Sequence, residues 1–89
     1  MVQELHARYF KPVPGTVYHN KGGSDYVCLD AGETVAHFMN VYSGWTLLAF
    51  GLVQYENGWI EWDWSKGLTF DKSRLENFKN GNDYRGDYK

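Results

Sequence analysis

Residues 53–62, with the sequence VQYENGWIEW, constrain the fold more than any other part of the chain. At their centre lies the dipeptide Asn57-Gly58. A two-residue type I′ turn needs positive φ angles at both central positions, and Asn followed by Gly tolerates that geometry best. The segment therefore predicts a β-hairpin that is closed by a type I′ turn.

A two-residue turn also fixes which residues of the hairpin lie opposite one another. A slip by one residue would exchange the two faces of each strand, so the pattern specifies one register. On the apolar face the predicted pairs are Tyr55 with Ile60, Val53 with Trp62, and Gly51 with Trp64. On the polar face they are Glu56 with Trp59, Gln54 with Glu61, and Leu52 with Asp63. This register places Trp62 and Trp64 in the core.

The chain is short for an independently folding domain. With 89 residues, it buries only roughly 60–65% of the surface that its unfolded form exposes. Aromatic residues compensate, because they make up 18% of the chain and each buried ring removes about 150–250 Å² from water. We therefore expect a single domain, residues 1–89, with a small and largely aromatic core.

Charge and cysteine content exclude several classes of protein. The net charge of −2 argues against non-specific nucleic-acid binding, which needs a basic stripe for the phosphates, and leaves a local basic patch open. The single cysteine, Cys28, excludes an internal disulfide. Residues 1–8 lack the apolar run of a signal peptide, and the apolar residues 47–53 are too few to cross a bilayer. We expect a cytoplasmic protein that binds neither nucleic acid nor membranes.

Turn signals recur along most of the chain and predict short strands. Besides the hairpin, the predicted strands are residues 16–19, 26–29, 34–42, 45–50 and 68–70. Gly51 predicts a bulge or sharp bend, and residues 65–67 predict a turn. Short strands separated by turns every 8–12 residues or so predict an all-β fold. We favour a small antiparallel SH3-like barrel of five or six strands, and an open, strongly bent sheet is the alternative.

The two ends of the chain differ from the β core, which we expect over residues 14–70. Residues 1–13 form an N-terminal arm whose pattern suits either a helix or a strand before the prolines. Residues 71–81 predict a short helix, with Asp71 or Ser73 as its N-cap. Residues 82–89 are polar and predict a frayed tail.

Trp59 is the first candidate for a binding residue. The predicted register places it on the polar face beside the turn, and an exposed Trp is a frequent hot spot of protein interfaces. Glu56, Glu61 and Asp63 line the same face and form an acidic rim for a basic partner. The alternatives are that Trp59 covers the end of the barrel, and that the carboxylates belong to an ordinary solvated face.

Three tyrosines, Tyr18, Tyr26 and Tyr42, form an alternative ligand site, because small β-barrels stack bases on such rings. A nucleic-acid site would add basic residues, yet Lys21 and Lys66 are the only lysines or arginines over residues 13–71. A small nucleotide therefore suits these rings better than a polymer does.

No pattern predicts catalysis or a bound metal. The spacings of the histidines and of Cys28 do not match the close pairs of zinc ligands. The glycine-rich residues 21–24 join two strands, whereas a phosphate-binding loop leads into a helix. We therefore expect a protein without enzymatic activity, metal or cofactor.

Three segments carry a resemblance to known proteins: residues 43–46 (SGWT), 49–51 (AFG) and 55–65 (YENGWIEWDWS), with residues 26–29 (YVCL) upstream. They are similar to a group of short uncharacterised proteins of Gram-positive bacteria, their phages and mobile elements. The likeness covers roughly residues 15–67. Where such proteins carry Ala-His-Gly this chain has Ala49-Phe50-Gly51, so no role of a histidine is carried over. The resemblance implies an accessory protein that binds and inhibits a host component, but no particular activity.

These observations lead us to expect a non-catalytic protein-binding module. Its most specific form is a phage or mobile-element protein that inhibits a host protein, such as a defence factor, through Trp59, Glu56, Glu61 and Asp63. The alternative is a β-barrel that sequesters a small ligand or nucleotide on Tyr18, Tyr26 and Tyr42. A homodimer through the Leu52 and Trp59 side, or through an edge strand, is a further alternative.

Overall fold

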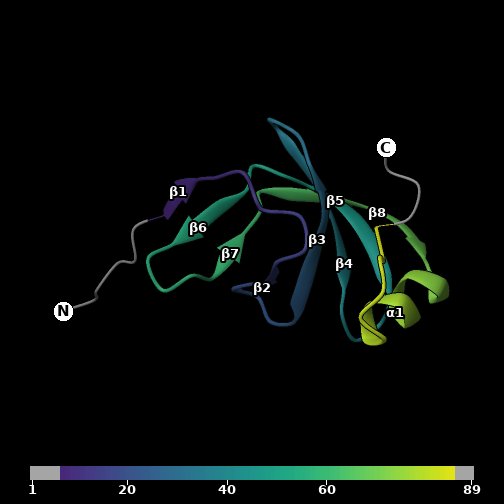
Figure 1. Cartoon of the computed structure of the whole chain (residues 1–89). Helices are drawn as coiled ribbons and strands as arrows, with labels where there is room; N and C mark the ends of the chain where they lie inside the picture. The colour runs from purple at the N-terminus through teal and green to yellow at the C-terminus, as the bar shows by residue number, and fades with distance from the viewer. Residues whose placement is uncertain (1–6, 86–89) are drawn as a thin grey trace.

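The computed structural model describes residues 7–85, which contain eight strands and one helix arranged around two antiparallel sheets (Figure 1). The larger sheet has the order β2 (Val17–His19), β3 (Asp25–Ala31), β4 (Val35–Asn40), β5 (Trp45–Phe50) and β8 (Trp64–Phe70). The smaller sheet has the order β1 (Ala7–Tyr9), β6 (Val53–Tyr55) and β7 (Ile60–Glu61). The prediction of a small antiparallel all-β fold is confirmed. The described pairings leave β2 and β8 as edges of the larger sheet and do not include a closed barrel.

Gly51 forms the bend that joins the two sheets, as predicted. The chain passes from β5 to β6 at this residue, and its φ of +69° is a left-handed conformation that side chains rarely adopt. A Cβ atom on Gly51 would lie 2.6 Å from the Cβ of Asp63, which occupies the corresponding point between β7 and β8. The chain therefore enters the smaller sheet between β5 and β6, and returns to the larger sheet between β7 and β8, at the same place.

The hairpin is confirmed, but its predicted turn and register are wrong. The backbone N–H of Tyr55 donates to the carbonyl of Trp59 (2.9 Å), which leaves residues 56–58 as a three-residue loop. Of these only Gly58 has a positive φ, +93°, as in a type I turn followed by a glycine bulge. Asn57 has the negative φ of a type I turn, and its side chain accepts from the N–H of Trp59 (3.0 Å). The pairs are therefore Val53 with Glu61 and Gln54 with Ile60.

This one-residue shift exchanges the faces of β6. Leu52, which the predicted register placed on the polar face, is buried with 7% exposure. Tyr55 moves to the outer face, where its hydroxyl donates to Glu61. The other strand keeps its predicted orientation, because Ile60 is fully buried and Trp62 packs against the same core.

Trp64 lies outside the core, contrary to prediction, and no turn occurs at residues 65–67. Residues 64–70 form β8 instead, an edge strand in which every residue is exposed. The segment stays extended because it pairs with β5, for example Leu48 with Lys66 and Phe50 with Trp64. Trp64 is 55% exposed and stacks flat on Phe50, with ring centroids 4.0 Å apart.

Buried apolar residues lie on both faces of the larger sheet. We call the set between the two sheets the inter-sheet core: Cys28, Ala36, Phe38, Ala49, Leu52 and Ile60. We call the set beneath the helix the helix-side core: Val27, Leu29, Met39 and Leu75. Because β3 and β4 contribute to both cores, the middle of the larger sheet is buried on both sides.

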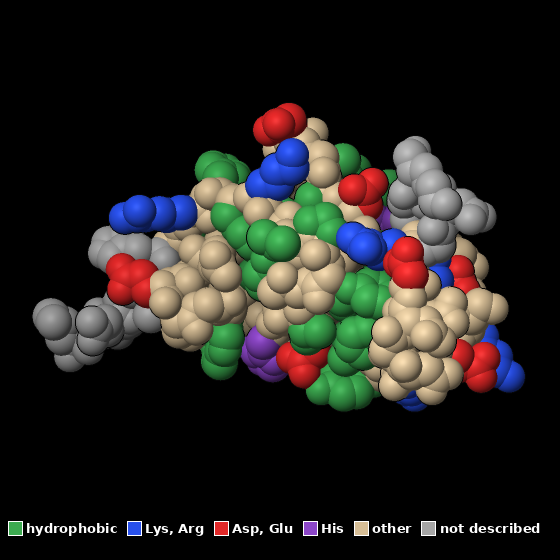
Figure 2. All heavy atoms as spheres, viewed as in Figure 1, with side chains coloured by type: hydrophobic (Ala, Val, Ile, Leu, Met, Phe, Trp, Pro, Cys, Tyr) green, Lys and Arg blue, Asp and Glu red, His purple; other side chains and the backbone are tan. Residues whose placement is uncertain are grey.

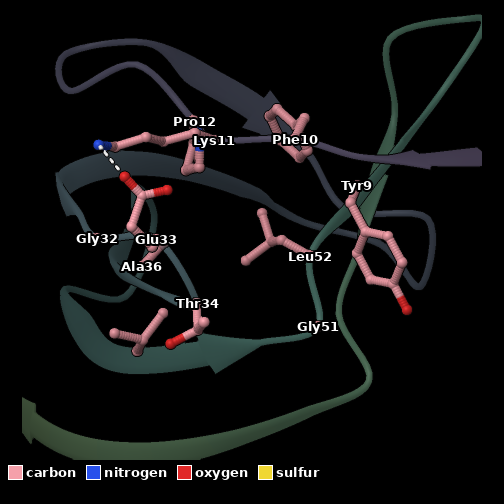
Figure 3. A pocket seen from close by; sticks show the side chains of 11 residues that line it. Tyr9, Phe10, Lys11, Pro12, Gly32, Glu33, Thr34, Ala36, Gly51 and Leu52 are labelled. Atoms are coloured by element: carbon pink, nitrogen blue, oxygen red, sulfur yellow. Dashed lines mark ion pairs between the residues drawn. The ribbon is translucent and has the colours of Figure 1, made fainter.

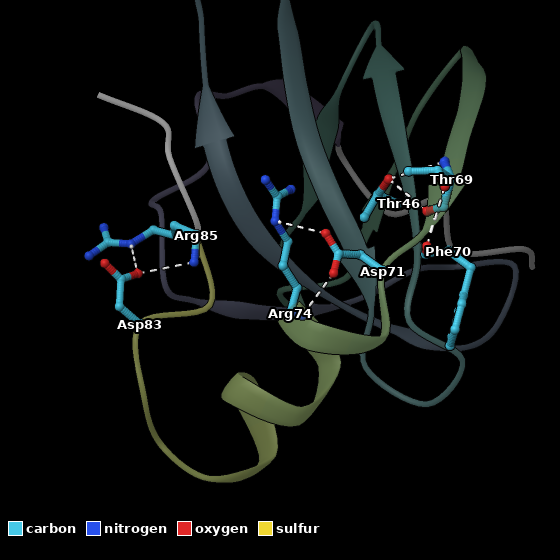
Figure 4. Close-up of polar contacts among 7 residues, drawn as sticks. All are labelled: Thr46, Thr69, Phe70, Asp71, Arg74, Asp83 and Arg85. Atoms are coloured by element: carbon cyan, nitrogen blue, oxygen red, sulfur yellow. Dashed lines mark hydrogen bonds and ion pairs between the residues drawn. The ribbon is translucent and has the colours of Figure 1, made fainter.

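The helix α1 (Lys72–Lys79) follows β8 directly and confirms the helix prediction (Figure 4). Asp71 is the N-cap: its carboxylate accepts from the backbone N–H of Arg74 (3.0 Å) and lies 3.4 Å from the Arg74 Nε atom. Leu75 is the buried residue of the helix. No helix in the described part of the chain has the length and hydrophobicity to cross a bilayer.

The two ends of the described region are more ordered than predicted. Ala7–Tyr9 pairs with β6, which settles the open choice between helix and strand for that part of the arm. Tyr84, assigned to the frayed tail, packs on Phe78 and against the helix-side core. The predictions for residues 1–6 and 86–89 lie outside the described residues.

Candidate functional site

Trp59 lies at the end of the hairpin loop, directly before β7, and is 41% exposed. Its ring rests against the imidazole of His19, with centroids 5.1 Å apart and planes tilted by 55°. The loop after β2 holds the two residues together. Asn20 forms a parallel bridge with Ile60, and the N–H of Lys21 donates to the Ile60 carbonyl (2.8 Å).

Asp25 holds the His19 side chain in place, and Tyr42 in turn holds Asp25. The Nδ1 atom of His19 lies 2.8 Å from Oδ1 of Asp25, and the Tyr42 hydroxyl donates to the other carboxylate oxygen at 2.5 Å. The hydrogen bonds from Tyr42 and His19 lower the pKa of Asp25 below its ordinary value, while the bond to Asp25 raises the pKa of Tyr42. Asp25 is therefore a charged anchor at neutral pH that fixes the imidazole beneath Trp59.

A second polar group lies on the same hairpin face. The Tyr55 hydroxyl donates to Oε1 of Glu61 at 2.5 Å. Lys21 reaches over the Tyr55 ring, with Nζ 4.8 Å from the centroid and 3.4 Å from the hydroxyl. We call the combined surface the Trp59 face: Trp59, His19, Asp25, Tyr42, Tyr55, Glu61 and Lys21.

The structure brings together only part of the predicted acidic rim. Glu61 lies in β7, two residues after Trp59, and belongs to the Trp59 face. Glu56 is exposed in the hairpin loop and lines a shallow hollow with Arg8. Asp63 is exposed at the bend beside Gly51. Of these three carboxylates, Glu61 forms a hydrogen bond within the Trp59 face, and Glu56 lines its hollow together with Tyr55 of that face.

Sequence reasoning missed the contact of His19 with Trp59 and the part that Asp25 and Lys21 play in the same face. These three residues come from the β2–β3 hairpin, more than thirty residues earlier in the chain. His19 and Asp25 are opposite each other in the β2–β3 ladder, so a hairpin prediction that paired them would have found their contact. No local pattern, however, indicates that this hairpin packs on β7.

The three tyrosines of the alternative site do not form one stacking surface. Tyr18 and Tyr26 are cross-strand partners whose rings pack edge-on against Phe38 at 6.3 and 6.4 Å, so both are partly buried against the inter-sheet core. The Tyr18 hydroxyl is already used, because it accepts from the N–H of Val13 (2.9 Å). Tyr42 is 66% exposed and belongs to the Trp59 face.

The remaining reactive side chains lie in the interior. Burial raises the pKa of Cys28 to about 12, so the thiol is protonated and a poor nucleophile at neutral pH. Burial, with a smaller effect of Arg74, lowers the pKa of His37. Within residues 7–85, no group of three His, Cys, Asp or Glu side chains is arranged to hold a metal ion.

Comparison with protein-family models, with curated proteins and with solved structures found no match for this chain. The geometry therefore carries the functional argument. Figure 2 shows hydrophobic side chains over the middle of one face of the molecule, with charged side chains of both signs around them.

Proposed function

We propose that this protein is a non-catalytic protein-binding module that contacts its partner through the Trp59 face. The observation that carries the proposal is the exposed Trp59 ring, held against His19 by a network that ends at Asp25 and Tyr42. A large aromatic ring in a fixed orientation is the kind of residue that dominates interface energetics.

Preorganisation is the physical advantage of this arrangement. An interface side chain that must be immobilised on binding costs about 0.5–1.5 kcal/mol of conformational entropy. The contacts of Trp59 with His19, and of Tyr55 with Glu61 and Lys21, restrict these side chains before any partner arrives. More of the contact energy is then available for affinity.

Charge favours a particular class of partner surface. Asp25 and Glu61 contribute two carboxylates to the Trp59 face, Glu56 and Asp63 lie in the neighbouring loop and bend, and Lys21 is the one lysine or arginine in the face as defined. A partner with an apolar centre and a basic rim suits this surface. In its most specific form, the proposal is a phage or mobile-element protein that inhibits a host protein, which rests on the sequence resemblance.

The test compares two exposed tryptophans. The tagged full-length protein is used to capture partners from a Gram-positive lysate, and the captured protein is then purified for affinity measurements by calorimetry. We expect Trp59→Ala to weaken binding by about tenfold or more, which corresponds to about 1.4 kcal/mol. Trp45→Ala is the matched control, because Trp45 is 56% exposed and lies on β5, outside the Trp59 face.

A second variant tests the network. His19→Ala keeps Trp59 but removes its support, and we expect an intermediate loss of affinity. Equal affinity of Trp59→Ala and the unaltered protein for the same partner, with both folded by circular dichroism, would contradict the proposed contact surface.

A further inference from the structure

A cavity of about 380 Å³ opens between the arm at residues 9–12, the turn that joins β3 and β4, and the bend at Gly51 (Figure 3). None of its lining residues belongs to the Trp59 face. Its volume lies in the range of roughly 300–1,000 Å³ that is typical of small-molecule sites. The cavity is therefore separate from the Trp59 face and large enough for a small molecule.

The floor of the cavity is the hydrophobic core itself. Leu52 and Ala36 line it, and both are members of the inter-sheet core, with 7% and 2% exposure. Phe10, half-buried, and Pro12, buried, close it from the side of the arm. An apolar group that entered would continue the packing of the core and leave water, which is favourable in proportion to the area removed.

The mouth carries the charged groups of the cavity. Lys11 Nζ lies 3.8 Å from Oε1 of Glu33, and these side chains are 57% and 89% exposed. An ion pair this exposed contributes little stability and is readily opened. Arg8 lies on the same arm, in the adjoining hollow beside Tyr9 and Phe10.

We infer that this cavity binds a small amphiphile with an apolar body and a carboxylate head. The carboxylate would take the place of Glu33 beside Lys11, exchanging one carboxylate for another. A cationic head would have Glu33 as the one acidic residue of the lining, but it would lie near Lys11 and, in the adjoining hollow, Arg8. If each non-hydrogen atom needs roughly 30 Å³, the share of a water molecule in the liquid, the cavity holds a body of about a dozen atoms. Medium-chain aliphatic acids and small aromatic acids have this size.

Three ligands of equal chain length test the inference: octanoate, octanol and octylamine. Each is titrated into the ¹⁵N-labelled full-length protein, and backbone amide shifts are followed by NMR. We expect saturable shifts around Leu52, Ala36 and Phe10, with a Kd for octanoate on the order of 1 mM, as befits a ligand of about ten atoms. Octanol should bind more weakly, and octylamine more weakly still.

Lys11→Gln separates the contribution of the carboxylate head to affinity from that of the apolar body. We expect this variant to weaken the binding of octanoate by up to about fivefold, so that its affinity equals that of octanol. The affinity for octanol should not change. Lys66→Gln is the matched control, because Lys66 lies on β8 and does not line the cavity. Absence of saturable shifts at about 10 mM octanoate, roughly ten times the expected Kd, equal binding of octylamine, or shifts centred away from these residues would overturn the inference.

Discussion

Gly51→Ala is the substitution with the most definite structural consequence. The new side chain would meet two separate penalties at one position. Its backbone would have to keep a φ of +69°, and its Cβ would lie 2.6 Å from the Cβ of Asp63. Left-handed strain costs on the order of 1 kcal/mol or more, and an overpacked contact costs about 1–3 kcal/mol.

The sum is a destabilisation of about 2–5 kcal/mol. A chain of 89 residues has a free energy of unfolding of about 4–13 kcal/mol, so the loss is large and measurable. Urea denaturation followed by tryptophan fluorescence gives this free energy for each variant.

Two other glycines separate the two penalties. Gly58 has a φ of +93°, but a Cβ added there would have no atom within 4 Å, so Gly58→Ala should cost only the strain, about 1 kcal/mol. Gly67 lies in the extended β8 with equally open space, and Gly67→Ala should raise the free energy of unfolding by about 0.5–1 kcal/mol.

Removing the opposing Cβ completes the design. In a double-mutant cycle, Asp63→Gly should restore about 1–3 kcal/mol of the stability that Gly51→Ala loses. If Gly51→Ala is no more harmful than Gly58→Ala, or if Asp63→Gly restores nothing, the close approach of the two bends does not limit the fold.

Three further predictions concern the interior and the helix. Cys28 has a pKa of about 12, so at neutral pH it should react with iodoacetamide much more slowly in the native protein than in concentrated guanidinium. Mass spectrometry measures the two rates. Equal rates would mean that β3 is open. The pKa of His37 is lower in the folded protein than the unfolded value near 6.5, so its contribution to stability should be complete above pH 6.5 and should fall as the pH drops through 6.5 towards the folded pKa. His37→Gln should flatten this part of the pH–stability curve, and an unchanged slope would assign it to another group. Asp71→Ala, which removes the N-cap of α1, should cost about 0.5–2 kcal/mol in urea denaturation, whereas Ser73→Ala, inside the first turn, should cost less.

Local patterns predict much of this fold because they report local physics. The predicted strand at residues 45–50 coincides with β5, since a run of aromatic and aliphatic residues bounded by Gly44 and Gly51 leaves few other choices. The bend at Gly51 follows from the need for a residue without a Cβ at a close approach. The helix after Asp71 follows from a cap and an apolar pair, Leu75 and Phe78.

The hairpin register shows where such patterns stop. Asn57-Gly58 suits both a two-residue type I′ turn and a three-residue loop with a glycine bulge, and the two differ by one residue. Packing decides between them, because the observed register buries Leu52 beside Ile60. Trp59 is exposed in either case, although it lies opposite Tyr55 and not opposite Glu56.

Contacts between distant segments were the other part that the sequence could not indicate. Trp64 reads as a core residue from its spacing, yet it lies on an edge strand because the sheet ends there. The support of Trp59 by His19 and Asp25 depends on how the β2–β3 hairpin packs on β7, which is a property of the whole fold.

The irregular ladder of β8 has a consequence for how this protein behaves in concentrated solution. Seven consecutive exposed residues at a sheet edge, with Trp64, Leu68 and Phe70 among them, would ordinarily invite growth of fibres by strand addition. The register shift opposite Trp45 and Leu47 interrupts the repeat of the edge, and Lys66 places a charge within it. A strand of a second molecule can therefore pair with only short regular stretches of β8. The irregular pairing of this edge strand thus limits the aggregation that its exposure favours.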